Sequence, residues 1–315
     1  MMFEWRKMGI IFDARGNHTL ANTHTMVPCP MRMSDRIRLY YTSCCEKGVG
    51  RPFFVDLDIT DLTKVIGCSD GPVMDIGNAG TFDENGVICC SLVRLNNKKI
   101  LMYYAGFELG TKIRYRLLSG LAQSLDGGFS FSRVKDTPIL ERSDTELYFR
   151  GGPFALKTSK SFEMWYAAGS RWLSVAGRQM PQYDIRKISS KNGIDWPKMG
   201  KIQIPIVSKD DFAFGRPAVV EVRDNSYWMF FSVRKRSINE YRLGFAHSRD
   251  KINWERNDEL LNLDVSSLEF ETDAIMYATP LLLGEEFYLF YNGSKFGQHG
   301  IALAKLENFN EICQI

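Results

Sequence analysis

The sequence predicts an all-β protein, a five-bladed β-propeller with four-stranded antiparallel blades. Five times along the chain an aromatic pair ends a short strand, and the second members of these pairs are 63, 62, 65 and 60 residues apart. A repeat of this length that is rich in short strands is typical of sheets arranged radially, because one small sheet cannot bury both of its faces. Five such units account for residues 1–315 as a single domain. The pairs are Tyr40-Tyr41, Tyr103-Tyr104, Trp165-Tyr166, Phe230-Phe231 and Phe290-Tyr291.

The second observation is that each unit repeats the same succession of strands. An apolar run predicts a buried inner strand at 26–31, 90–95, 153–156, 217–222 and 279–283. A polar turn and the aromatic strand follow, at 37–41, 100–104, 162–166, 227–231 and 287–291. A third strand with small residues then leads into a Gly- or Asn-containing turn and an aromatic residue, as in 120–131, 190–196 and 244–254.

The third observation concerns the ends of the chain. The last repeat stops soon after 300–304 without the aromatic residue that closes the earlier third strands. The missing segment is found at the N-terminus, where Phe3-Glu4-Trp5-Arg6-Lys7 is similar to Ile252-Asn253-Trp254-Glu255-Arg256. We therefore expect the N-terminal strand to complete the last blade and close the ring, which removes an exposed sheet edge.

Composition limits the classes of partner and location. The net charge is +3, from 40 basic and 37 acidic residues, and no long basic run indicates nucleic-acid binding. No stretch reaches transmembrane length, and residues 1–5 lack the apolar core of a signal peptide. The seven cysteines include adjacent pairs and no zinc-type spacing, which favours a reducing cytoplasm. We expect neither a metal site nor a cofactor.

The blade pattern resembles the five-bladed glycosidase superfamily over nearly the whole chain. The segments that carry the resemblance are 80–87, 290–293 and 300–304, together with the strand order. That superfamily contains arabinanases, xylosidases, invertases, levansucrases and mannoside phosphorylases, in glycoside hydrolase families 32, 43, 68 and 130. The resemblance implies a fold and a sugar ligand, but a fold alone does not determine an activity.

The resemblance also implies catalytic carboxylates at the starts of the inner strands, and this sequence departs from that pattern. The corresponding positions carry His24-Thr25, Cys89-Cys90-Ser91, Arg150-Gly151-Gly152, Gly215-Arg216 and Asp273-Ala274. The standard catalytic motifs are therefore absent, which argues against a simple arabinanase or xylosidase.

Other carboxylates remain for acid or base chemistry. Asp273, before the fifth inner strand, is the first choice for a base or nucleophile, and Asp83 or Glu271 is its predicted partner. A structural alternative stays open for each: Asp83 could cap a turn, and Asp273 could be a solvated loop charge. Glu146 and Asp211 are the other carboxylates in such loops, and Glu146 could simply neutralise Arg150.

Basic and aromatic residues suggest the chemistry of a ligand. Arg150 and Arg216 lie close before inner-strand prolines, and His24 is expected to join them across the funnel. Guanidinium groups suit carboxylates and phosphates, so an acidic sugar, a sugar phosphate or a nucleotide-sugar is the predicted ligand. Tyr277 and Trp172 are predicted to contact the sugar, although either arginine could instead bind loop carbonyls and Trp172 could pack on a neighbouring blade.

Two functions follow from these observations. The first is a carbohydrate-active enzyme, glycoside hydrolase-like, that cleaves or transfers a glycosyl group in polysaccharide metabolism. The second is a catalytically inactive propeller that binds a saccharide or a protein through its axial funnel.

Overall fold

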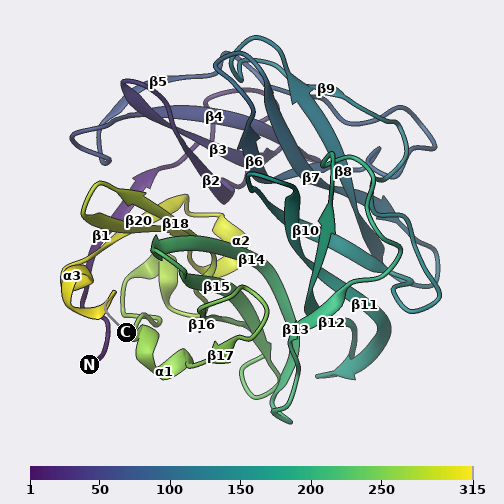
Figure 1. Ribbon diagram of the computed structural model, residues 1–315. Helices are drawn as coiled ribbons and strands as arrows, with labels where there is room; N and C mark the ends of the chain where they lie inside the picture. Colours follow the sequence, from purple (N-terminus) through teal and green to yellow (C-terminus); the bar gives the residue numbers. More distant parts are fainter. Residues whose placement is uncertain (314–315) are drawn as a thin grey trace.

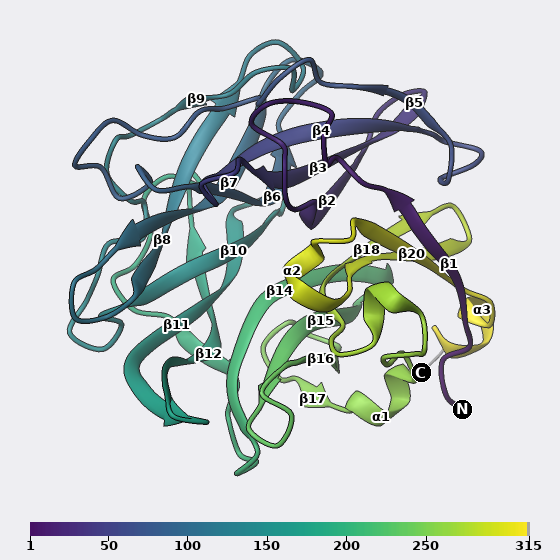
Figure 2. The ribbon, with the colours of Figure 1, turned by 180° about the vertical axis from the view of Figure 1, so that it is seen from behind.

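A computed structural model describes residues 1–313, and it is built almost entirely from antiparallel β-sheet. Sets of strands that are consecutive in the sequence are grouped around a common centre (Figure 1). The same grouping is visible from behind, where the N-terminal strand lies beside the C-terminal strands (Figure 2). No helix in residues 1–313 is long and apolar enough to cross a membrane.

The first two sets are made by the N-terminal part of the chain, up to Arg133. The first set has the order β2-β3-β4-β5, with bounds Met26–Arg32, Arg36–Cys44, Gly50–Asp58 and Val65–Cys68. The second set contains β6 to β9, with bounds Val87–Arg94, Ile100–Leu109, Tyr115–Ser124 and Ser132–Arg133.

The middle of the chain forms two further antiparallel sets. One contains β10 to β13, with bounds Phe149–Lys157, Phe162–Val175, Arg178–Ser190 and Lys201–Ile204. The other contains β14 to β17, with bounds Asp211–Arg223, Ser226–Lys235, Tyr241–Ser248 and Glu255–Arg256. Short parallel pairings of β8 with β10 and of β12 with β14 join the strands from β6 to β17 in one sheet.

The last sheet joins the two ends of the chain, as the sequence predicted. Its order is β1-β20-β19-β18, with bounds Trp5–Phe12, Ile301–Leu306, Glu286–Asn292 and Met276–Leu283. Trp5 pairs with Leu306, and the Trp5 indole N–H donates to the Leu261 carbonyl at 2.7 Å. Short helical segments decorate this part of the chain, at α1 Asp258–Leu261, η1 Glu269–Glu271, α2 Ser294–Gly297 and α3 Phe309–Ile312.

The aromatic pairs explain how the sets pack on one another. Successive residues of a strand point to opposite faces of the sheet, so each pair supplies one aromatic residue to each face. Tyr104 packs in a cluster with Tyr40 from the preceding set, whereas Tyr103 packs in a cluster with Tyr166 from the following set. The aromatic pattern that predicted the repeat therefore reflects the packing between neighbouring sets.

The inner strands meet at the centre of the molecule. Contacts run from β2 to β6, β10, β14 and β18 in turn, and β18 also contacts β2. Apart from Leu95, the predicted inner and aromatic strands lie within the observed ones. The inner strands after β2 begin earlier than predicted, by up to six residues for β14. These earlier starts matter for the site, because the residues that they add to the inner strands lie near the centre.

Removal of Phe3 tests the role of the N-terminal segment. Phe3 is fully buried and its ring lies 4.9 Å from that of Trp228, so we expect Phe3→Ala to lower the free energy of unfolding by about 3–5 kcal/mol. Deletion of residues 1–8 should cost at least as much, because it also removes the start of β1. Urea denaturation measures both, with the exposed Met2→Ala as the control. An unchanged midpoint for the deletion would contradict the idea that this strand holds the last sheet.

Candidate functional site

The centre of the molecule contains a cavity of about 490 Å³. Residues from all five inner strands line it, together with residues from the second and third strands of several sets and from α2. The wall includes His24, Val27, Tyr115, Gly152, Tyr183, Arg216, Ser232, Arg234, Tyr241 and Tyr277. A volume of this size is typical of a site for a small ligand.

A repeated irregularity in the inner strands shapes the cavity wall. Each of β2, β6, β10, β14 and β18 has a bulge in its pairing with the next strand. Four bulges contain a residue with left-handed φ, namely Val27 at 58°, Gly152 at 62°, Arg216 at 54° and Tyr277 at 57°. This conformation is unfavourable for residues other than glycine, most of all for the β-branched valine. All four residues line the cavity, so the bulges aim these positions at the centre.

Buried hydroxyl and amide groups satisfy the backbone at these bulges. The Val27 N–H donates to Asn292 Oδ1 at 2.8 Å, and the Tyr277 N–H donates to Ser232 Oγ at 2.9 Å. The acceptors come from strands that run beside the inner strands, so the bulges are fixed by side chains that the sequence places at particular positions.

Arg216 forms part of the cavity wall and crosses from β14 to two other inner strands. Its Nη2 donates to the Pro28 carbonyl at 3.0 Å and to Thr279 Oγ1 at 3.1 Å. The side chain is buried, and its Nε and Nη1 have no hydrogen-bond acceptor within residues 1–313. The predicted placement of Arg216 at the centre is therefore consistent with the structure, and one of its nitrogens also binds a backbone carbonyl.

Arg234 is a second buried arginine on the cavity wall, and the sequence reasoning missed it. Its guanidinium carbon lies 4.6 Å from the centroid of the Tyr241 ring, and its Nε has no acceptor among the described residues. Ser232 and Arg234 alternate with the core residues Phe231 and Val233, so both point to the same face of β15. The signal in the sequence that points to Arg234 is a charged residue in the continuation of an apolar strand.

Three tyrosines and the histidine of the wall are neutral at pH 7. Burial raises the pKa of Tyr115 to about 12 and the pKa values of Tyr183 and Tyr277 well above their usual value. Burial, followed by the charge of Arg15, lowers the pKa of His24. The described residues that line the cavity include no aspartate or glutamate, so its electrostatic character is positive.

Two of the predicted catalytic carboxylates lie elsewhere, in a repeated structural arrangement. Asp83 is fully buried, pairs with Arg133 at 2.7 Å and accepts a hydrogen bond from the Tyr104 hydroxyl at 3.0 Å. Glu271 is also fully buried, pairs with Lys7 at 2.6 Å and accepts from the Tyr291 hydroxyl at 3.0 Å. We call this combination the carboxylate clamp: a carboxylate that precedes an inner strand, a tyrosine in the second position of the aromatic pair, and a cation.

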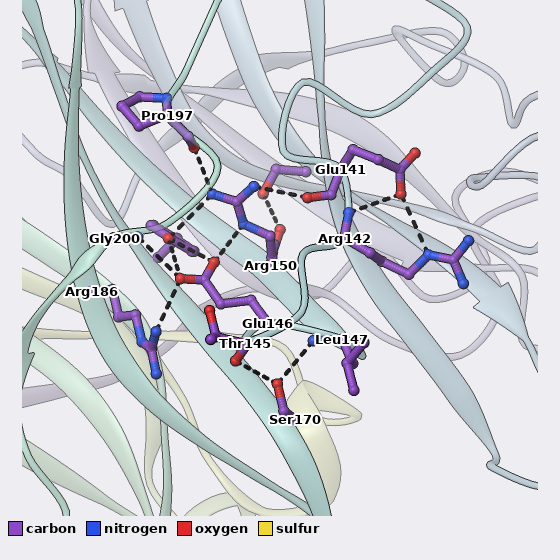
Figure 3. A network of polar contacts seen from close by, with 12 residues as sticks. Glu141, Arg142, Thr145, Glu146, Leu147, Arg150, Ser170, Arg186, Pro197 and Gly200 are labelled. Atoms are coloured by element: carbon purple, nitrogen blue, oxygen red, sulfur yellow. Dashed lines mark hydrogen bonds and ion pairs between the residues drawn. The ribbon is translucent and has the colours of Figure 1, made fainter.

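The same clamp surrounds Arg150, which the sequence reasoning assigned to the substrate (Figure 3). Arg150 Nε lies 2.5 Å from Glu146 Oε2, and the Tyr166 hydroxyl donates to the same oxygen at 2.8 Å. Arg186 also pairs with Glu146, at 3.1 Å. Arg150 is absent from the cavity wall, so the alternative that Glu146 neutralises it fits the geometry.

The clamp has a regular spacing in the sequence. Its carboxylate precedes the tyrosine by 21, 20 and 20 residues in the three sets, and Asp211 keeps a similar distance from Phe231, which has no hydroxyl. Asp211 still pairs with a cation, Arg256, at 2.8 Å. The catalytic role predicted for Asp83 and Glu271 therefore has no support in this geometry, because their carboxylates are already bound inside the sheets.

The other predicted site residues fall in different places. His24 and Tyr277 line the cavity. Trp172 lies behind the wall, with its ring 6.0 Å from Tyr115. Asp273 is exposed on the loop before β18, where its carbonyl accepts from Arg242 Nη1 at 2.8 Å. The structure thus brings together three of the eight predicted residues, His24, Arg216 and Tyr277, in one cavity.

Comparison with known proteins supplies the family context. No family model matches the sequence. Two proteins of Mycobacterium tuberculosis, the uncharacterized proteins MT1551 and Rv1502, are each 28% identical to this chain over 306 residues, which cover 96% of this chain and 99% of each relative. Neither name states an activity.

Solved structures match the fold over nearly the whole chain. The structure of a complex of BT0996 with RGII superposes with a TM-score of 0.70 and 17% identity, covering 96% of this protein and 92% of that one. A family GH43_1 enzyme from Xanthomonas citri complexed with xylose has a TM-score of 0.65 and 12% identity, with 95% and 90% coverage. A GH130 structure, from a family described as containing mannoside phosphorylases and glycoside hydrolases, has a TM-score of 0.65 and 10% identity, with 97% and 94% coverage.

The chain has a glycoside-hydrolase-like fold. The likeness is to propeller-type families and agrees with the all-β part of the predicted fold class, while identities of this size establish no activity. Within this glycoside-hydrolase-like fold, the described residues of the cavity wall include arginines and tyrosines and no carboxylate.

Substitution of the clamp carboxylates separates a structural role from a catalytic one. We expect Asp83→Asn and Glu271→Gln to lower the free energy of unfolding by about 3–5 kcal/mol each, because each leaves a cation without its buried partner. The matched control is Asp273→Asn, which should stay within about 0.5 kcal/mol of the wild type because Asp273 is exposed. Urea denaturation followed by tryptophan fluorescence measures all three. Equal stability of the three variants would contradict the clamp.

Proposed function

We propose that the strand sets are the blades of a five-bladed propeller that β1 closes, and that its central cavity binds a saccharide. The single observation that carries this proposal is the cavity itself, at the point where the inner strands converge. Its wall combines aromatic rings with hydroxyl and guanidinium groups, which are the groups that bind the apolar faces and the hydroxyls of sugars. The glycoside hydrolases that share the fold support a sugar as the ligand.

Binding is favoured over hydrolysis by the chemistry of the wall. Glycoside hydrolysis generally requires two carboxyl groups that flank the scissile bond. Asp83 and Glu271 are enclosed in clamps and Asp273 is exposed, and none of them lines the cavity. The seven cysteines are free thiols, which supports the further proposal that the protein works in a reducing cytoplasm.

A specific observation keeps glycosyl cleavage or transfer as the second candidate. Glu240 is half-buried and directly precedes the cavity residue Tyr241 in the sequence. Burial raises its pKa and nearby Arg234 partly opposes this shift, while the charge of Asp273 raises the pKa further. A carboxyl group with a raised pKa that interacts with a second carboxylate is the combination that supplies a general acid and its partner. Asp273 therefore remains the proposed base or nucleophile of this second candidate, with Glu240 as its partner.

A glycan array tests the binding proposal. Tyr115 lines the cavity with its ring packed edge-on against Phe149, so Tyr115→Ala should weaken saccharide binding by roughly 1–2 kcal/mol through lost contact area and stacking. Tyr148→Ala is the matched control, because Tyr148 belongs to the same aromatic cluster but not to the cavity wall. Absence of any glycan signal from the folded wild type, or equal loss in the two variants, would contradict a saccharide site in the cavity.

Turnover of the glycans that bind tests the second candidate. If Asp273 acts as base or nucleophile, Asp273→Asn should lower the rate of hydrolysis by roughly 10²–10⁴ and leave binding almost unchanged. The exposed Glu285→Gln removes one carboxylate elsewhere on the surface and should leave the rate unchanged. A wild type that binds a glycan without cleaving or transferring it excludes the enzymatic candidate.

A further inference from the structure

The cavity wall carries two buried arginines, Arg216 and Arg234, that have no carboxylate partner within residues 1–313. They are only 5% and 8% exposed. Other arginines buried in this protein are paired, since Arg38 binds Asp56 at 2.8 Å and Arg150 binds Glu146 at 2.5 Å. A buried guanidinium without a counter-charge is costly, because the charge has lost its hydration and gained no ion pair.

The hydrogen bonds of the two arginines leave several donors unused among the described residues. Arg216 uses Nη2 for the Pro28 carbonyl, Cys29 Sγ and Thr279 Oγ1, whereas its Nε and Nη1 have no acceptor there. In Arg234, Nε likewise has no acceptor and Nη1 faces the sulfur of Met180, at 4.0 Å. Arg216 Nε and Nη1 and Arg234 Nε are themselves shielded from solvent, whereas Arg234 Nη2 makes no hydrogen bond to the described residues and is not among the shielded nitrogens, so it is the donor that a ligand in the cavity could reach.

Aromatic stacking does not account for Arg234. Its guanidinium lies 4.6 Å from the Tyr241 ring, but Arg38 and Arg256 also stack on rings, at 3.8 Å from Phe54 and 4.7 Å from Phe214. Both of those arginines pair with a carboxylate as well. For these two arginines, stacking accompanies an ion pair and does not replace it. Arg234 is the exception, because it interacts with the half-buried Glu240 only through its charge and forms no ion pair with it.

The tyrosines of the wall do not supply the missing charge either. Tyr115, Tyr183 and Tyr277 stay protonated at pH 7, because burial raises the pKa of Tyr115 to about 12 and those of Tyr183 and Tyr277 well above the usual value. Neutral phenols can donate to an anionic ligand and accept from its hydroxyls, but they carry no negative charge.

The two arginines lie on neighbouring strands. Arg234 on β15 is opposite Ala213 of β14, three residues before Arg216. Three residues of strand span about 10 Å, so the two residues are neighbours in the sheet. Both residues line the same cavity, which is the basis for assigning them to a shared site.

We infer that Arg216 and Arg234 form an anion subsite, and that the saccharide bound in the cavity carries a compact anionic group, a carboxylate or a phosphate. Both groups present several oxygen acceptors close together, which is the arrangement that guanidinium donors recognise. This inference rests on the proposed saccharide function. It also replaces Arg150 by Arg234 as the partner of Arg216.

Inorganic phosphate tests the subsite independently of any sugar. Phosphate should raise the midpoint of thermal unfolding of the wild type, compared with sodium chloride at equal ionic strength and about pH 7.5. Arg234→Gln should weaken the apparent phosphate affinity by about ten- to a hundredfold, the effect of losing a charge-assisted hydrogen bond. Arg236→Gln is the matched control. It removes the same charge from a side chain that is exposed, lies two residues further along the chain and is outside the cavity wall. No effect of phosphate on the wild type, or an equal effect on both variants, overturns the subsite.

The stability of the ligand-free protein gives a second readout. A ligand-binding arginine that lacks a protein partner should be dispensable for folding, so Arg234→Met should unfold at the wild-type temperature or above it. Arg38→Met should unfold at a clearly lower temperature, because it leaves Asp56 buried without its partner. Failure of Arg234→Met to fold, or a drop as large as that of Arg38→Met, would show that Arg234 is structural and would overturn the inference.

Glycans with and without an anionic group distinguish the two proposals. On an array that holds neutral, carboxylated and phosphorylated glycans, we expect binding to anionic members and its loss in Arg234→Gln. Binding that depends neither on the anionic group nor on Arg234 agrees with the saccharide proposal and contradicts the subsite. Phosphate binding that depends on Arg234, without binding to any glycan, supports the subsite and removes the saccharide proposal. Selective binding of carboxylated or of phosphorylated glycans identifies which anion the subsite takes.

Discussion

Convergence of the inner strands is the constraint on which the rest of the structure depends. Five strands, β2, β6, β10, β14 and β18, contact one another in sequence around the centre, where straight ladders would leave little room. Each strand bulges there, and four bulges place a residue in the left-handed conformation. The bulges open the cavity and also decide which side chains enter it, so packing and function are set by the same local distortion.

Buried charge in this protein is organised in two contrasting ways. Inside the sheets, carboxylates such as Asp83 and Glu146 are matched by cations and tyrosine hydroxyls. Repetition of this clamp stabilises the loop that leads into each of these inner strands, and it explains why carboxylates recur near those positions. In the cavity, by contrast, Arg216 and Arg234 have no carboxylate partner among the described residues. Buried arginines without an ion pair lower the stability of the fold, and such a cost is expected at a site that binds a ligand.

The site differs from a two-carboxylate active site although the fold is glycoside-hydrolase-like. Neutral tyrosines and cationic arginines can orient a sugar and hold an anionic substituent, but the described residues of the wall offer no carboxylate for proton transfer. Glu240 and Asp273 are carboxylates with an electrostatic link to this region, outside the wall itself. Binding and catalysis are therefore separable questions for this protein.

The sequence by itself determined the inner and aromatic strands, their order and the association of β1 with the last sheet, because period-two aromatic patterns and the repeat length are visible along the chain. It also indicated His24, Arg216 and Tyr277 for the centre, since these residues lie close to or within the starts of inner strands. Only the tertiary structure decided that Asp83 and Glu271 are clamped and that Arg234 faces the cavity. The physical reason is that a buried charge acquires its role from partners that are distant in sequence, such as Lys7 for Glu271, and that the cavity exists only where all five inner strands meet.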